Sequence, residues 1–299
     1  MRVRVAALVA VVLAAGCGST HGHPKAQTGG TFDALAARPG ADVAIVAGDG
    51  DFAPGSIRFS FLVIDRRAKP VLRRTADVWV ATARDRRPFA HATARLEPIG
   101  IPGVSESALG GVTSIYVTRF RVSRAARYWV LTQPLRAKVQ ALGTIDVKPH
   151  SASPPVGAKA PTSATPTVRS AHGNLAALTT RTPPDVLLLR YSIAGSLAAH
   201  KPFVVVFATP KFCESRTCGP VVDVTMRVQR DLGARVRFIH VEVYRDNDPA
   251  KGYNAWMRQW HLLSEPWAFL VGRNGRIKAK LEGSFSVREL ESAVRAYLL

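Results

Sequence analysis

One stretch in the middle of the chain constrains the fold more than any other feature. Residues 149–184 are rich in proline, serine, alanine and threonine and contain few large apolar side chains. Such a segment cannot bury enough apolar surface to offset the entropy of ordering it. The sequence therefore predicts an extended linker here, with a folded unit on each side and with the second unit mobile relative to the first. A chain of 299 residues is long enough for two such units.

The first unit, residues 41–148, reads as a series of short β-strands. Several segments alternate apolar and polar residues, and glycine-rich turns such as Gly48–Asp51 separate them. The expected strands are residues 42–47, 57–64, 77–81, 114–122, 127–131 and 144–147. Short strands at this spacing predict an all-β sandwich. No group of His, Asp, Glu or Cys in this unit has catalytic or metal-binding spacing, which indicates a binding or spacing module.

One segment of this unit resembles the immunoglobulin-like folds. Within Ala125–Val130, a tyrosine lies two residues before a core position, as it does in the late strand of those folds. Val130 stands where true immunoglobulin domains have a cysteine, so their disulfide is absent. The resemblance implies an immunoglobulin-like sandwich.

The second unit, residues 185–299, alternates strands and helices. Its apolar runs and stripes predict strands at 202–207 and 236–243, a hairpin at 267–271 and 277–281, and helices at 221–232, 253–262 and 286–298. Asn274-Gly275 is a strong hairpin turn signal. Ser286 and Glu289 form a capping box at the start of the last helix.

The cysteine pair Cys213 and Cys218 lies just after the first of these strands, with four residues between the two cysteines. Cys218 falls at the predicted N-terminus of a helix, where free N–H groups and the helix dipole stabilise a thiolate. Lys211 and Arg216 would add to that stabilisation, whereas Glu214 would oppose it. A four-residue spacer can bring the two Cα atoms within the roughly 4.4–6.8 Å that a disulfide needs. We therefore expect a reversible Cys213–Cys218 disulfide, with either cysteine as the attacking thiol.

The second unit resembles the thioredoxin fold in three places. The apolar strand ends at Phe207 just before the cysteines, Cys218-Gly219-Pro220 repeats the start of the thioredoxin motif, and Pro266 stands where the family has its cis-proline. The resemblance implies an α/β thioredoxin-like fold and a thiol-disulfide oxidoreductase, with Cys213, Cys218 and Pro266 as its catalytic residues and no cofactor. Glu265 stands where that family usually has a small or β-branched residue, and we expect either Glu265 or a water to handle protons as a further part of the catalytic site.

The motif departs from that family in its spacing. Val221 stands where thioredoxins have their second cysteine, and the partner, Cys213, lies upstream instead.

The N-terminus predicts export from the cytoplasm. Arg2 and Arg4 precede an apolar run, Val5–Ala15, that is too short to span a bilayer as a helix, which needs about 20 residues. Small residues then lead to Cys17, and this arrangement resembles a bacterial lipoprotein signal. It implies a signal peptide at 1–16, lipidation of Cys17, a tether at 17–40, and a lipid anchor on the extracytoplasmic face of the cell membrane.

The charge of the chain is strongly basic. The net charge of +20 falls to +18 once the two arginines of the leader are removed. The basic residues are scattered through both units without a long run, so we expect no nucleic-acid partner. Anionic lipids or envelope polymers are the partners that this charge favours, although a solvated basic surface needs no partner at all. Protein thiols and disulfides of the cell envelope are the expected substrates.

Two other readings of the cysteine pair remain open. A permanent disulfide would make the chain a non-catalytic lipoprotein that acts as an interaction module. A copper chaperone similar to the Sco type would use Cys213, Cys218, His240 and His261, because soft thiolates suit Cu(I). Thr209 stands four residues before Cys213, close to the threonine of peroxiredoxins, so peroxidase chemistry is a further alternative.

Overall fold

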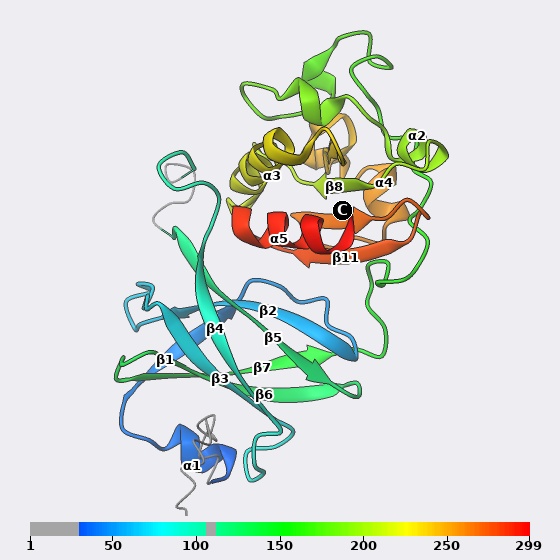
Figure 1. The fold of residues 1–299 in the computed structure, drawn as a ribbon. Helices are drawn as coiled ribbons and strands as arrows, with labels where there is room; N and C mark the ends of the chain where they lie inside the picture. Colours follow the sequence, from blue (N-terminus) through cyan, green and yellow to red (C-terminus); the bar gives the residue numbers. More distant parts are fainter. Residues whose placement is uncertain (1–29, 106–111) are drawn as a thin grey trace, which may run out of the picture.

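The computed structural model describes residues 30–105 and 112–299. Figure 1 shows a strand-built unit formed by the first half of the chain and, beside it, a second unit that carries the longer helices. The predicted signal peptide, Cys17 and most of the predicted tether lie outside the described residues. In chain order the elements are α1 (Phe32–Ala36), β1 (Ala41–Ala47), β2 (Gly55–Ile64), β3 (Thr75–Ala81), β4 (Ala90–Pro98), β5 (Ser114–Val122), β6 (Ala126–Pro134), β7 (Val139–Val147), the 3₁₀-helices η2 (Leu175–Ala177) and η3 (Val186–Leu189), α2 (Ile193–Ala198), β8 (Phe203–Phe207), α3 (Cys218–Leu232), β9 (Arg237–Val241), the 3₁₀-helices η4 (Arg245–Asn247) and η5 (Pro249–Lys251), α4 (Ala255–Gln259), β10 (Trp267–Val271), β11 (Ile277–Glu282) and α5 (Val287–Tyr297).

The first unit is a closed barrel of seven strands. Its strand order is β1-β2-β5-β4-β3-β6-β7. Neighbouring strands pair antiparallel, except that β1 also pairs parallel with β7, with Val43 opposite Ala141. This last pair closes the barrel, so that no strand has an unpaired edge along its whole length.

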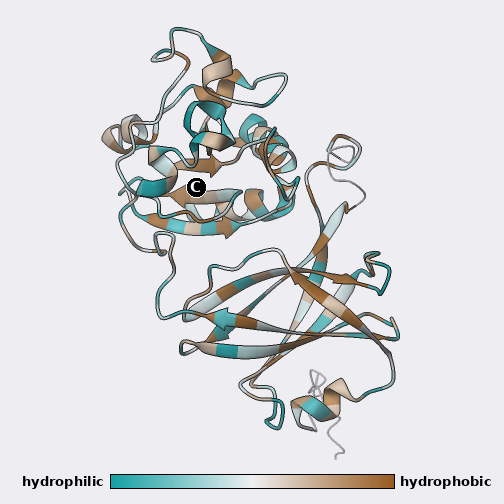
Figure 2. Cartoon of the chain, turned by 180° about the vertical axis from the view of Figure 1, so that it is seen from behind, coloured by the Kyte–Doolittle hydropathy of each residue, from teal (hydrophilic) through white to brown (hydrophobic). Residues whose placement is uncertain are grey.

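The barrel interior is apolar and rich in aromatic rings. Phe59 and Phe61 stack at 5.0 Å between ring centroids, and Phe61 stacks on Tyr116 at 5.3 Å. Figure 2 shows hydrophobic and hydrophilic residues alternating along the barrel strands, as expected when one face of each strand points inward. On the outside, Phe32 and Leu35 of α1 are buried against strand residues of the barrel. The end of the predicted tether is therefore packed on the barrel.

The predicted immunoglobulin-like sandwich is wrong, because the strands form one closed sheet. Short alternating strands suit a sandwich and a barrel equally, and the difference depends on the pairing of β1 with β7 at opposite ends of the unit. β4 was not predicted: its residues do alternate apolar and polar, but most of the apolar ones are alanines, which have low β propensity. Tyr128 does donate a hydrogen bond from its hydroxyl to the Arg124 carbonyl (2.8 Å). That local feature does not determine the sheet topology.

The second unit is built on a four-stranded mixed sheet with the order β11-β10-β8-β9. β8 and β9 run parallel, and the other neighbours are antiparallel. One face of the sheet packs against α3 and α5, whose apolar stripes are buried in a shared core. The opposite face packs against Trp260 and Met257 at α4. Asn274 and Gly275 form the predicted hairpin turn, and Gly275 adopts a φ of 71°.

The predicted α/β thioredoxin-like fold is also wrong. The chain is mostly β, the closed seven-stranded barrel is the larger of its two sheets, and its helices are few. α2 and α4 have only six and five residues. An apolar stripe shows where a helical turn forms but not how far it continues. The helix expected at 253–262 is reduced to Ala255–Gln259, because Asn254 caps its start and the helix closes at Trp260.

The predicted linker lies against the second unit. Ala160 is buried in its core, and the Ser163 hydroxyl accepts a hydrogen bond from the Trp260 indole (3.0 Å). The segment also pairs with the start of β11, where the Ile277 N–H bonds to the Ala158 carbonyl (2.9 Å) and the Ala160 N–H to the Gly275 carbonyl (2.9 Å). Polar and small residues are thus ordered by a surface that another part of the chain provides.

A buried arginine joins the two units. Arg58 of β2 forms a two-point ion pair with Glu289 of α5 (2.7 and 3.0 Å) and a third bond to Asp49 (2.9 Å). It also donates to the carbonyls of Glu282 and Ser284. The Ser286 hydroxyl accepts the Glu289 N–H, as the predicted capping box requires, but the Glu289 carboxylate binds Arg58. Burial raises the pKa of Asp49 to about 7, against the opposing influence of Arg58.

Candidate functional site

The two cysteines lie at the carboxyl end of β8, in the loop that leads into α3. Two short turns shape this loop: the Phe212 N–H bonds to the Thr209 carbonyl, and the Arg216 N–H bonds to the Cys213 carbonyl (3.1 Å). Arg216 adopts a φ of 58°, the left-handed region. This turn folds Cys213 back toward the first residue of α3, so the spacer does bring the two cysteines together.

Cys213 is the cysteine with the stabilised thiolate. Its sulfur accepts the backbone N–H of Cys218 (3.3 Å) and lies 3.2 Å from the Ser215 hydroxyl. Hydrogen bonding from the Cys218 side chain, followed by that from Ser215 and the backbone, lowers the pKa of Cys213 to about 6. The side chain is half-buried. It therefore combines thiolate character at neutral pH with access from solvent, which are the two requirements of an attacking thiol.

Cys218 has the opposite character. It is the first residue of α3 and is completely buried, with 0% of its surface exposed. Burial, together with the hydrogen bond and the negative charge of Cys213, raises its pKa far above the ordinary value. The sequence placed the stabilised thiolate on Cys218. The structure instead aims the first N–H of the helix at the sulfur of Cys213. Both thiols are free, and the predicted disulfide remains a prediction.

The two basic side chains near the cysteines do not provide the stabilisation expected of them. The Lys211 ammonium lies over the ring of Phe212 (5.2 Å), and Arg216 is exposed. Neither is among the causes that lower the pKa of Cys213, which are all hydrogen bonds. The site thus depends on local hydrogen bonds rather than on a nearby cation.

Glu265 faces the cysteines from the loop before β10. The peptide bond between Glu265 and Pro266 is cis, and Pro266 is buried. Burial first, and then the negative charge of Cys213, raise the pKa of Glu265. Tyr253 donates a hydrogen bond from its hydroxyl to this carboxylate (3.2 Å), and burial together with Glu265 raises the pKa of Tyr253 to about 12. The expected neighbours of the thiols are therefore present around them.

The two histidines considered for copper lie in different surroundings. His240 is buried in β9, with Nε2 3.0 Å from the Ala208 carbonyl and Nδ1 3.4 Å from the Thr179 hydroxyl. His261 is exposed beyond α4. Within residues 30–105 and 112–299, no three His, Cys, Asp or Glu side chains are grouped so that they could hold a metal ion.

The sequence analysis did not predict the hydrogen bonds that join the linker to the cysteine loop. Thr180, in the predicted linker, donates from its N–H (2.6 Å) and its hydroxyl (2.8 Å) to the buried carboxylate of Glu242. The same hydroxyl accepts the backbone N–H of Lys211 (3.2 Å). The linker therefore supports the loop that carries Cys213. No local pattern could have revealed these hydrogen bonds, since Thr180 lies in a stretch whose composition predicts an unstructured linker.

The barrel also reaches the cysteine helix. Ser105, beyond β4, donates from its hydroxyl to Asp223 of α3 (2.9 Å), and Asp223 pairs with Arg181 of the linker (2.8 Å). Ile101 packs against the core around α3. The first turns of α3 are thus held by two other parts of the chain, the loop after β4 and the linker.

No protein-family model matches the chain, and no match is found among curated proteins. In the part of the chain that the structure describes, no helix combines the length and the apolar character needed to cross a membrane. The chemistry of the cysteine site therefore has to be argued from its own geometry.

Proposed function

We propose that the protein is a thiol-disulfide oxidoreductase that uses Cys213 and Cys218. One observation carries the proposal: the two sulfurs are chemically unequal. Cys213 is half-exposed with a pKa of about 6, whereas Cys218 is buried with a raised pKa. An accessible thiolate beside a protected thiol is the arrangement that disulfide exchange requires of its attacking and resolving groups.

The exchange has two steps. The Cys213 thiolate attacks one sulfur of a substrate disulfide, whose S–S bond breaks and releases a substrate thiolate that takes up a proton. A mixed disulfide between Cys213 and the substrate results. Cys218 then loses its proton and attacks the Cys213 sulfur, which releases the second substrate thiolate and leaves a Cys213–Cys218 disulfide. The substrate gains two electrons, and a protein dithiol returns the pair to its reduced form.

Glu265 is the group that we propose to receive the proton of Cys218. Its carboxylate is half-buried, and its charge raises the pKa of Cys218. A carboxylate with a raised pKa accepts a proton more readily than an ordinary one at neutral pH. Pro266, which follows Glu265 after a cis peptide bond, is the further residue that we propose to lie beside the sulfurs.

We further propose that this chemistry takes place outside the cytoplasm. The lipoprotein-like leader would anchor the protein to the membrane through lipid on Cys17. Its substrates would be thiols and disulfides of envelope proteins, and its net positive charge would favour contact with anionic lipids or envelope polymers. A permanent disulfide is the second candidate, because complete burial of Cys218 also suits a structural bond.

A redox titration separates the two candidates. The full chain would carry Cys17→Ser, which removes the third thiol, and would be equilibrated in glutathione or dithiothreitol buffers before thiol counting. Catalytic dithiols have potentials between about −120 and −270 mV, and a value in this range supports the oxidoreductase. A potential well below about −300 mV indicates a permanent bond and contradicts the proposal. Further substitution of Cys213→Ser or Cys218→Ser must abolish the transition.

A further inference from the structure

A cavity of ≈ 440 Å³ opens at the end of the second unit's sheet away from the cysteines. Pro202 and Val236, the residues that precede β8 and β9, line it, whereas the cysteines follow the far end of β8. Its volume lies within the range of small-molecule sites. The proposed oxidoreductase activity makes no use of this cavity.

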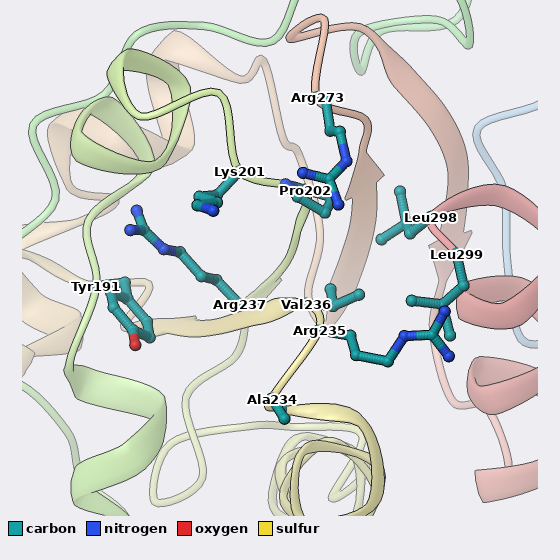
Figure 3. A pocket seen from close by; sticks show the side chains of 11 residues that line it. Tyr191, Lys201, Pro202, Ala234, Arg235, Val236, Arg237, Arg273, Leu298 and Leu299 are labelled. Atoms are coloured by element: carbon teal, nitrogen blue, oxygen red, sulfur yellow. The ribbon is translucent and has the colours of Figure 1, made fainter.

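The lining of the cavity is basic. Lys201, Arg235, Arg237 and Arg273 come from three loops and the start of β9, and none of the lining side chains is Asp or Glu. Figure 3 shows Lys201 and Arg237 on the side of Tyr191, Arg273 directed toward Pro202, and Arg235 extended toward Leu299. Three cations, Lys201, Arg237 and Arg273, therefore line the cavity from different segments of the chain.

These three cations lack the carboxylate partners that many arginines of this chain have. Among residues 30–105 and 112–299, no ion pair joins any of the three to a carboxylate. Like charges that share a cavity repel one another when no ion pair holds them, and the entry of an anion lowers the free energy of this arrangement.

Arg237 is held in place before any ligand arrives. Its guanidinium lies 4.5 Å from the ring centroid of Tyr191. One of its nitrogens donates to the Gly195 carbonyl (3.2 Å) and lies 3.3 Å from the Ser196 hydroxyl. Arginine has five N–H donors, so these contacts leave others for a ligand. A positioned guanidinium loses little side-chain entropy on binding, which strengthens the site.

We propose that this cavity binds a phosphate group. Three cations suit a multiply charged group with several acceptor oxygens better than a single carboxylate, and arginine binds phosphate through paired hydrogen bonds. The apolar surface of Pro202, Val236 and Leu298 lies beside the cations and accommodates a carbon-containing portion of the ligand. A soluble phosphate ester and the headgroup of an anionic lipid share this chemistry.

The test measures phosphate binding by the full chain and by two double variants of equal charge. Lys201→Gln/Arg273→Gln removes two cations from the cavity. Arg66→Gln/Arg67→Gln removes two exposed cations from the barrel turn between β2 and β3 and serves as the matched control. The probes are inorganic phosphate and glycerol 3-phosphate by calorimetry, and phosphatidylglycerol-containing vesicles by sedimentation. Thermal unfolding of each variant verifies that it is folded.

The proposal expects the cavity variant to bind at least about tenfold more weakly and the control variant to bind as the unchanged chain does. Saturable binding of glycerol 3-phosphate would identify a soluble ligand, and loss confined to vesicles would identify a lipid headgroup. Equal losses in both variants would show that net charge alone acts, and would overturn the proposal, as would the absence of binding to all three probes. The Cys213–Cys218 redox transition is read separately, so failure here leaves the proposed function standing.

Discussion

At the scale of single residues, the cysteine site shows how hydrogen bonds and burial give two identical side chains different properties. The N–H of Cys218 points at the sulfur of Cys213, and the helix that follows buries the thiol of Cys218. The pKa of Cys213 falls to about 6, while that of Cys218 rises. Their reactivity should therefore differ even though only four residues separate them.

The alkylation rate of Cys213 should follow its thiolate. Because only the thiolate reacts, the iodoacetamide rate of the Cys17→Ser protein should rise with pH through a midpoint near 6 and then level off. Peptide mapping assigns the label to Cys213. Ser215→Ala removes one stabilising hydrogen bond, so the midpoint should move upward and the rate at pH 6 should fall about threefold. Ser170→Ala, in the linker, serves as the control. An unperturbed midpoint near 8.5 would contradict the assignment.

Asp51 provides a second residue-scale prediction. Hydrogen bonds from Ser151 and Ser153, aided by Lys280, outweigh burial and hold the pKa of Asp51 at about 2. An acid whose folded pKa is depressed stabilises the protein above its unfolded pKa of 3.8, and this contribution is lost as pH falls through about 2.

Asp51→Asn should therefore lower the free energy of unfolding by about 1–2 kcal/mol at pH 7. The difference from the unchanged protein should shrink as the pH falls below 4, become small near pH 2 and vanish below it. Urea unfolding across this pH range measures it, with exposed Asp85→Asn as a control that should show no such dependence. A constant difference at all pH values would refute the ionic explanation.

At the scale of elements, the start of α5 combines two roles in one hydroxyl. Ser286 accepts the Glu289 N–H (3.1 Å) and donates to the buried carboxylate of Glu97 in the barrel (2.8 Å). Ser286→Ala should lose both the cap and a donor to Glu97, at a cost of about 2 kcal/mol. Ser192, the cap of α2, accepts only the Gly195 N–H, so Ser192→Ala should cost about half as much. Urea unfolding compares the two variants, and equal losses would exclude a role for Glu97.

Helices and strands were predictable from sequence to the extent that local patterns determine them. The stripe Val221, Val224, Val228 and Leu232 is buried along α3, as predicted, and Ser286 caps α5. The closure of the barrel was not predictable, because it depends on pairing between strands at opposite ends of the unit. The sequence left open which cysteine is the attacking thiol, because the answer depends on the left-handed turn at Arg216. The support from Thr180 was not predictable either, since it comes from a segment without any structural signal of its own.

At the scale of the whole molecule, Arg58 couples the two units. Its guanidinium forms ion pairs with the carboxylates of Glu289 and Asp49, and all three side chains are largely shielded from water. Arg58→Met leaves the Glu289 carboxylate without its main partner, whereas Asp49 can take up a proton because its pKa is already about 7. We expect a loss of about 3 kcal/mol, the lower end for a broken buried pair.

The same substitution should also separate the unfolding of the two units. Fluorescence and circular dichroism would then report distinct urea transitions for Arg58→Met and a single transition for the unchanged chain. Arg127→Met breaks an exposed pair with Asp146 on the barrel and should leave the unfolding curve unchanged. A single, unshifted transition in Arg58→Met would show that the interface does not depend on this arginine.

The linker that lies along β11 has a consequence for how the protein can be divided. β11 is an edge strand, and an uncovered edge is a template for strand-to-strand aggregation between molecules. Backbone bonds from residues 157–160 cover its beginning, and the Glu282 side chain at its end accepts the N–H groups of Gly50 and Asp51 from the barrel (2.8 Å each). A proteolytic fragment that starts after residue 160 would lose both covers and expose a self-associating strand. We therefore expect the linker and the barrel to protect this edge, so that the intact chain self-associates less than such a fragment.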